Sequence, residues 1–439
     1  MLACVHGLGP GDPMTGFRMT LAAVAIAGLL PLLMGLVKAG TIGLAVPINA
    51  LHGMLTSIGV TIIIKQFYVL GGIKPVTKTT FTQLFEIFTR FPDDNYEILL
   101  IGVICLITVI AFNKIPKIGK FVPPPLAAVI VGYIASLVAD LEHPHVVTLM
   151  NGQFEVGPKF LLHVPENISE YFLTPLFTGL PMGIFIKSVI TITLVASIES
   201  VLSTYAVDKL DPLKRTSNLN MDLISKGCCN LVLGLIGGLP VISEIVRSSA
   251  NVSSGATGRW SNLFHGLFIL IFILIATVVL NEIPLTAFAA ILIYVGYRLA
   301  NPAQLKHVLA TGKDQLAVFL TTLIVTLNTD LLIGILVGSV LELILNLVRA
   351  KSVGGLFLFS AKTDGNTIKV LSPCVFSNML SLKSRIDKST ASQIEVDFRS
   401  CPFVDHSSKE ILLNTQRQKS LLGQKVSFVG LDLSAEAHH

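Results

Sequence analysis

Charged residues are scarce in this chain. They account for 13% of its 439 residues, while hydrophobic residues account for 52%. Soluble globular domains carry about 25% charged residues, and the mean hydropathy of this chain is +0.74. The composition therefore excludes a soluble globular protein and indicates a polytopic membrane protein embedded in a lipid bilayer.

The sequence also lacks metal-binding spacings and clustered basic residues. The six cysteines never occur as C-x-x-C, and the adjacent pair Cys228 and Cys229 lies inside an apolar run. These spacings argue against a disulfide framework and a zinc site. His143 and His145 have no partner at a zinc-ligand spacing, which favours loop residues and no metal. The net charge is +5, but the basic residues punctuate apolar runs, so we expect no nucleic-acid partner.

The first residues do not have the pattern of a signal peptide, because no basic segment followed by an apolar core occurs there. Their glycine and proline content predicts an N-terminal loop over residues 1–16. Residues 17–350 predict a transmembrane domain of about eleven helical segments. These segments are 17–37, 46–70, 97–113, 122–139, 180–205, 221–239, 241–256, 263–280, 285–297, 316–327 and 331–348.

Lysine and arginine gather on alternate connections between these segments, which predicts that those connections and residues 351–439 face the cytoplasm. Charged residues return in this last part of the chain. We expect strands over 367–374, 393–398 and 424–430, and helices over 376–386 and 408–418. Their alternation predicts a small α/β domain with a mainly parallel sheet. The cluster from Asp405 to Ser408 precedes a helix, where capping is favoured over a phosphorylation or nucleotide site.

One stretch at bilayer depth, residues 237–260, carries Glu244, Arg247, Asn251 and several serines between two apolar runs. Polar groups at that depth are costly unless they face protein or a water-filled cavity. Small residues there also permit close helix packing, which is the alternative interpretation. The stretch is therefore the first candidate for a functional site.

Gly237, Gly238 and Pro240 predict a helix break in this stretch, because glycine is flexible and proline has no N–H group to donate. A short helix can restart near Val241. The free N–H groups of its first turn would attract an anion. Broken helices at the membrane midplane hold the substrate in many secondary transporters.

Glu199 lies in an apolar helical segment with small polar residues at helical spacing. An ionisable residue there is a candidate functional group: it could carry a proton, or a cation could bind beside it. The alternative is a structural pair with Arg247 or Lys187. Arg247 is either an anion-binding guanidinium or the partner of Glu199 or Glu244.

These residues lie in motifs that resemble the sulfate permease (SulP) family of anion transporters, in particular its bacterial carbonic anhydrase fusion-type branch. The motifs are Ile198-Glu-Ser-Val-Leu-Ser203, Ala206-Val-Asp-Lys-Leu-Asp-Pro212, Gly237-Gly238-Leu-Pro240, Val246-Arg-Ser-Ser-Ala-Asn251 and Ser254-Gly-Ala-Thr257. The resemblance extends from about Met19 to Leu433, and the C-terminal part resembles a STAS domain.

The resemblance implies two inverted repeats of seven helices, with the anion between the facing ends of two half-helices. Val246, Arg247 and Ser248 match the substrate position, and Glu199 matches an acidic position linked to proton or sodium coupling. It also implies a homodimer in the bacterial inner membrane, no cofactor besides the coupling ion, and possible protein partners for the STAS-like domain in the cytoplasm.

Two departures from the family pattern concern the ends of the chain. Residues 17–37 resemble the fourth helix of the family, so we expect an N-terminally truncated chain without the first three helices and the first half-helix. The STAS-like domain is also expected to lack its final helix.

The sequence as a whole predicts a transporter rather than an enzyme. Its expected activity is symport of an inorganic oxyanion, sulfate or bicarbonate, with H⁺ or Na⁺. Two alternatives stay open: a transport-incompetent fragment that acts as a membrane-anchored STAS interaction scaffold, and a nucleobase permease of the same general fold.

Overall fold

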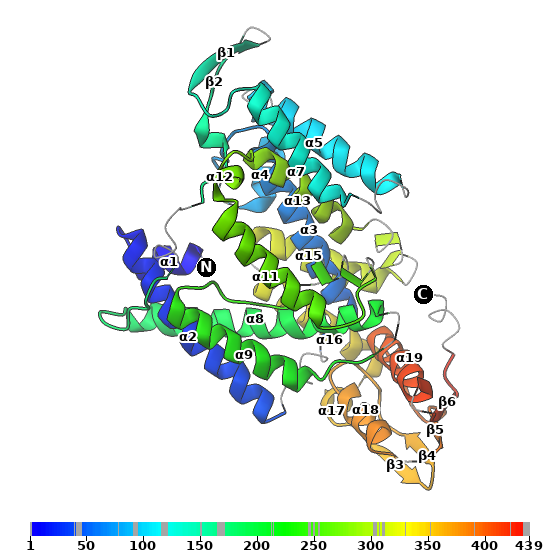
Figure 1. Cartoon of the computed structure of the whole chain (residues 1–439). Helices are drawn as coiled ribbons and strands as arrows, with labels where there is room; N and C mark the ends of the chain where they lie inside the picture. Colours follow the sequence, from blue (N-terminus) through cyan, green and yellow to red (C-terminus); the bar gives the residue numbers. More distant parts are fainter. Residues whose placement is uncertain are drawn as a thin grey trace.

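Helices form most of the protein, and a hairpin and a small sheet complete it (Figure 1). The computed structural model describes all residues except 1, 39, 41–45, 78, 91–94, 116–121, 150–151, 165–171, 212, 214, 245–246, 249–250, 253–254, 302–304, 307, 310–311, 330, 352, 390, 422 and 433–439. Within these described residues, six helices are long and apolar enough to cross a membrane, with spans at Pro13–Leu36, Ile48–Leu70, Tyr96–Lys114, Met182–Val201, Leu219–Ile236 and Ile333–Ala350.

The first helix group contains α1 (Leu2–Leu8), α2 (Pro13–Leu36), α8 (Met182–Leu210) and α9 (Leu219–Ile236). The backbones of α2 and α9 touch. A Cβ atom added to Gly28 would lie 2.5 Å from the backbone nitrogen of Leu231, and one added to Gly227 would lie 2.6 Å from that of Leu32. Small residues permit this approach, which maximises van der Waals contact between helices that lipid surrounds.

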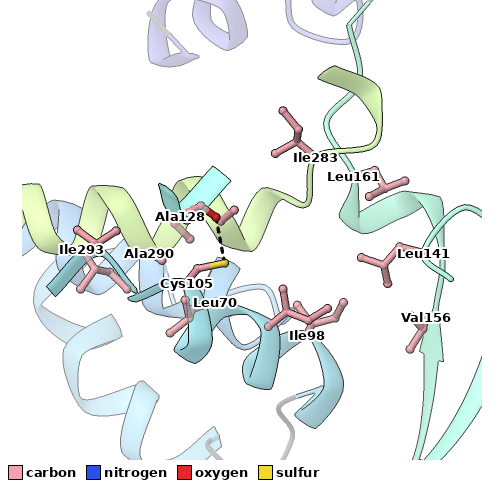
Figure 2. Packing of buried hydrophobic residues seen from close by; sticks show 14 residues of the cluster. Leu70, Ile98, Cys105, Ala128, Leu141, Val156, Leu161, Ile283, Ala290 and Ile293 are labelled. Carbon is pink, nitrogen blue, oxygen red and sulfur yellow. Dashed lines mark hydrogen bonds between the residues drawn. The ribbon is translucent and has the colours of Figure 1, made fainter. Parts of the chain in front are cut away.

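The second helix group is arranged around α3 (Ile48–Leu70). The others are α5 (Tyr96–Lys114), α7 (Pro124–Val138), α13 (Leu285–Leu299), α15 (Lys313–Asn328) and α16 (Leu331–Ala350), with the amphipathic α4 (Thr80–Arg90) at the edge. A cluster of buried aliphatic side chains around Cys105 joins α3, α5, α7 and α13 (Figure 2). Within it the Cys105 thiol donates to the carbonyl of Ala128 at 3.5 Å.

The remaining membrane helices are α11 (Trp260–Ile275) and α12 (Thr277–Asn281), and α11 buries none of its described residues. An antiparallel hairpin of β1 (His145–Leu149) and β2 (Gly152–Val156), followed by the 3₁₀ turn η3 (Pro158–Phe160), lies in the connection before α8. The sequence patterns did not indicate these strands.

The C-terminal α/β region follows α17 (Val353–Phe357). Its sheet contains β3 (Ala361–Asp364), β4 (Thr367–Val370), β5 (Gln393–Asp397) and β6 (Lys425–Val429), in that order. The last three strands are parallel, and α18 (Met379–Lys388) and α19 (His406–Leu421) connect them. A polytopic helical membrane protein with a small C-terminal α/β region is therefore the fold that the sequence predicts. Prediction missed β3, which pairs with β4 through a two-residue turn at Gly365 (φ +56°).

The prediction of a loop over residues 1–16 is wrong. Leu2–Leu8 forms α1, and α2 begins at Pro13. Proline is favoured at the first helical position because it has no N–H group to leave unpaired. The preceding Asp12 caps this helix by accepting from the Met14 N–H at 3.0 Å. Tertiary packing stabilises the short α1, because Leu8 is buried in a cluster with α2 and α8.

Candidate functional site

The helix break predicted at the end of α9 is present. Gly237 ends α9 in the left-handed conformation, with φ of 101°, which glycine adopts without steric cost. The N–H of Gly238 turns back to the carbonyl of Leu233 at 2.7 Å. The chain then runs through Pro240 without regular structure.

The helix does not restart near Val241, as the sequence predicted. Residues 241–244 are not helical, while 247–248 and 251–252 are. The side chain of Asn230 on α9 causes this difference. It accepts from the N–H of Val241 at 2.5 Å and donates to its carbonyl at 3.1 Å. This pair of hydrogen bonds competes with helix formation. Further along, the Ser248 N–H donates to the carbonyl of Glu244, as in a helix.

Ser243 attaches the same segment to α8. Its N–H donates to the hydroxyl of Ser200 at 3.1 Å, and its own hydroxyl accepts from Thr204 at 3.1 Å and donates to Asp222 at 3.4 Å. Ser200 is fully buried. It belongs to a row of buried hydroxyl residues on α8: Ser188, Thr193, Ser197, Ser200 and Ser203. This row turns the polar face of α8 toward protein rather than lipid.

Glu199 lies beside this polar contact, where the two helix groups meet. Its neighbour Ile198 packs against Leu51 and Ile335 of the second helix group. The Glu199 side chain is half-buried, and its carboxylate is close enough to Glu244 for the two charges to repel. Within the described residues, no ion pair joins Glu199 to Arg247 or Lys187.

Arg247 pairs with Glu244 instead, at 3.5 Å between Nε and Oε2, and its side chain is 76% exposed. The same Oε2 atom accepts from the Arg247 N–H at 2.8 Å, and the Ser248 hydroxyl donates to the Glu244 carbonyl at 2.6 Å. A carboxylate of the protein thus caps the short helix at the position where we expected an anion. Val246, the third predicted substrate residue, lies outside the described residues.

Sequence reasoning missed the polar residues that hold the broken segment, Asn230, Ser200 and Ser243. The position of Asn230 in an apolar helix could have indicated a buried polar contact, because an amide there needs a partner inside the protein. For the part of the chain that the structure describes, no group of three or more histidine, cysteine or acidic side chains could hold a metal ion.

Comparison with known protein families identifies the family of this chain. The pattern of the sulfate permease family matches residues 2–322. This chain belongs to the sulfate permease family. YvdB of Bacillus subtilis is 27% identical over 332 residues, which are 75% of this chain and 59% of that protein. The bicarbonate transporter BicA of Synechocystis is 25% identical over 348 residues, or 78% of this chain and 58% of BicA. The chain thus spans less than two thirds of these relatives.

Solved structures of sulfate permease relatives share the fold. The murine Solute Carrier 26 family member A9 anion transporter, in its inward-facing state, superposes with a TM-score of 0.61 at 12% identity, covering 95% of this chain and 70% of that one. The transmembrane domain of a cyanobacterial bicarbonate transporter BicA superposes with a TM-score of 0.56 at 22% identity, covering 77% of this chain and 80% of that one. Both confirm the predicted fold class.

Proposed function

We propose that this chain transports an inorganic oxyanion, sulfate or bicarbonate, across the membrane. Membership of the sulfate permease family and the similarity to BicA support the substrate class. The observation that carries the proposal is the broken helix after Gly237, which places a polar segment without regular structure between apolar helices beside Glu199. Broken helices of this kind suit an anion at the N-terminus of the second helix.

In this proposal the anion binds at the start of the short helix, at Val246, Arg247 and Ser248. The Glu244 carboxylate lies there against the Arg247 N–H. Because two anions repel at that distance, the substrate has to displace Glu244 before it binds. Glu199 couples transport to H⁺ or Na⁺, since it faces the same carboxylate and lies where the two helix groups meet.

The proposal includes the arrangement in the cell. The C-terminal α/β region is a STAS-like domain that faces the cytoplasm of a bacterium and serves protein partners, and the transporter is a homodimer. Support comes from the strand order, with three parallel strands crossed by α18 and α19, and from lysine and arginine on alternate connections.

Uptake of radiolabelled sulfate and bicarbonate into proteoliposomes tests the proposal. We expect saturable uptake of one anion, stimulated by an inward gradient of protons or of Na⁺. In Glu199→Gln the gradient should no longer stimulate uptake, because the neutral amide neither releases a proton nor attracts a cation. The control Glu155→Gln, in the exposed hairpin, should keep the stimulation. No saturable uptake of either anion would contradict the proposal and favour an interaction scaffold.

A further inference from the structure

Buried polar side chains connect the second helix group with the C-terminal α/β region. Each of the following is at most 5% exposed: Asn49, Gln315, Glu342, Asn346, Asp405 and Ser407. At one end the hydroxyl of Ser407 accepts from the N–H of Ile48 at 3.1 Å. Ile48 is the first residue of α3, whose N-cap Pro47 makes no side-chain cap hydrogen bond. The α/β region therefore caps a membrane helix.

On the membrane side the hydrogen bonds run toward Glu342 of α16. The side-chain amide of Asn49 donates to the side-chain oxygen Oε1 of Gln315. The Gln315 Nε2 group donates in turn to Oε1 of Glu342 at 3.3 Å. The second oxygen, Oε2 of Glu342, is buried and has no hydrogen-bond partner. Such an oxygen is costly to bury, because it has lost its water without replacement.

On the other side the hydrogen bonds run toward Asp405, just before α19. Its carboxylate accepts from the Asn346 amide at 3.0 Å and from the N–H groups of Phe376 and Ser408 at 2.8 and 2.7 Å. Since this carboxylate accepts, Asn346 must turn its NH₂ group toward it. The Oδ1 atom of Asn346 then points elsewhere, and it too is buried without a partner.

Glu342 and Asn346 are four residues apart on α16, so their side chains are neighbours on one helix face. Each leaves one acceptor oxygen without a donor. We propose that Glu342 binds a proton and donates it to Asn346, which completes a hydrogen-bond chain from α3 through α15 and α16 to α19. One proton satisfies both unpartnered oxygens and makes the attachment of the α/β region to the membrane helices depend on pH.

The acidic neighbour of Glu342 favours this position for the proton. Asp405 faces Glu342 from the start of α19, while the adjacent His406 acts in the opposite direction when it is charged. The ion pair of Asp314 with Arg349 is half-exposed at the ends of α15 and α16. Two carboxylates in one buried network repel each other, which favours a proton on one of them. Asp405 has three N–H donors that stabilise its charge, whereas Glu342 has one.

A proton also fits better than a metal ion. Two unpartnered oxygens are fewer ligands than a hard cation needs, while a carboxyl proton needs one acceptor. The proposal fixes the direction in which pH changes the attachment. Because the attached state binds the proton, low pH favours attachment, and rising pH weakens it once Glu342 ionises. The ionised carboxylate would face Asn346 Oδ1, and no donor would join them.

Hydrogen exchange of the full chain in lipid nanodiscs tests the proposal. The measurements run from about pH 5 to about pH 9, a range that extends well above the ordinary pKa of a carboxyl group. The amide of Ile48 reports attachment, those of Phe376 and Ser408 report the Asp405 end of the chain of hydrogen bonds, and those of β5 serve as an internal reference. After correction for intrinsic exchange, wild-type protection should fall as pH rises, by up to about tenfold per pH unit, the slope of one linked proton. In Glu342→Gln protection should stay constant, because the amide donates to Asn346 at every pH.

The control Glu155→Gln should keep the wild-type pH dependence. Constant protection in the wild type would overturn the proposal, and so would an unchanged slope in Glu342→Gln. A change in protection when choline replaces Na⁺ at fixed pH would overturn it in favour of a metal cation. If the variant does not fold, constant protection in the wild type still overturns the proposal, and none of these readouts depends on transport.

Discussion

The first helix group buries a row of hydroxyls on α8 beside its irregular segment, whereas α3, α5, α7 and α13 of the second group pack around aliphatic side chains. The buried polar side chains of the second group lie elsewhere, where α3, α15 and α16 meet the C-terminal α/β region. In the first, α2 and α9 touch through glycines, and Asn230 and Ser243 hold a segment without regular structure. In the second, the cluster around Cys105 packs continuous helices (Figure 2). Aliphatic side chains pack without a specific partner atom, whereas each buried polar group needs a hydrogen-bond partner. The difference indicates that the first group carries the site and the second supports it.

Removing aliphatic volume from the second group should have the largest effect on stability. Ile98→Ala deletes a side chain that is 1% exposed in the cluster of Figure 2. A cavity of this kind costs about 2–5 kcal/mol in well-packed cores. Thermal unfolding in nanodiscs measures the loss, and uptake per folded molecule should not change. The matched variant Ile107→Ala, 61% exposed on the same helix, should unfold near the wild-type temperature.

A methyl group between α2 and α9 should have the next largest effect. Gly227→Ala places a Cβ atom 2.6 Å from the Leu32 nitrogen, so the two backbones must separate. Such overpacking costs roughly 1–3 kcal/mol, although alanine favours a helix by about 1 kcal/mol over glycine. Gly266→Ala in α11, where a Cβ atom meets nothing within 4 Å, should be neutral or stabilising. Equal melting temperatures would contradict backbone contact between α2 and α9.

Sequence patterns predicted the apolar helices and the break at Gly237, because both depend on local chemistry. Lipid exposure selects apolar runs, and glycine and proline end helices wherever they occur. The position of the restart depends on a distant contact. Asn230 binds the backbone of Val241 across a turn, and no local propensity contains that information.

The same limit applies to individual site residues. Sequence reasoning left Arg247 as an anion-binding guanidinium or as the partner of Glu199 or Glu244, and the ion pair that the structure shows is with Glu244. The polar chain between α3 and α19 was not predicted at all, because its members are 359 positions apart at Ile48 and Ser407. Helix capping was favoured over a phosphorylation or nucleotide site at Asp405, which does accept from the Ser408 N–H.

Loss of the Asn230 amide would test whether polar contacts hold the site. Asn230→Ala leaves both backbone groups of Val241 without their partner, which costs roughly 1–2 kcal/mol. We expect faster hydrogen exchange over residues 239–244, and a smaller change in global stability than in Gly227→Ala. Asn328→Ala is the matched control, because that amide donates only to the Ile324 carbonyl of its own helix and is exposed. Unchanged exchange in Asn230→Ala would mean that another contact orders the segment.

The smallest effect is expected at Glu86, on α4 at the edge of the second group. Hydrogen bonds from Thr77 and from the Val76 N–H lower the pKa of Glu86 from 4.5 to about 2. A carboxyl group whose pKa is lowered by folding stabilises the folded state at pH values above its unfolded-state pKa. This contribution is lost as the pH falls through the folded-state pKa. Amides of Val76 and Thr77 should therefore lose protection, after correction for intrinsic exchange, between about pH 4.5 and pH 2.

Glu86→Gln tests whether the charge of Glu86, rather than its size, stabilises the contact with Val76 and Thr77. The neutral side chain keeps its size but accepts more weakly from Val76 and Thr77, so their amides should exchange faster at neutral pH and lose their acid dependence. Glu155, which pairs with Lys159 in the exposed hairpin, provides the matched control as Glu155→Gln. Since α4 lies outside the aliphatic cluster, global unfolding should not change. A large drop in melting temperature would show that the polar contact at α4 stabilises the second group as the aliphatic cluster does, and the contrast between the two groups would not hold.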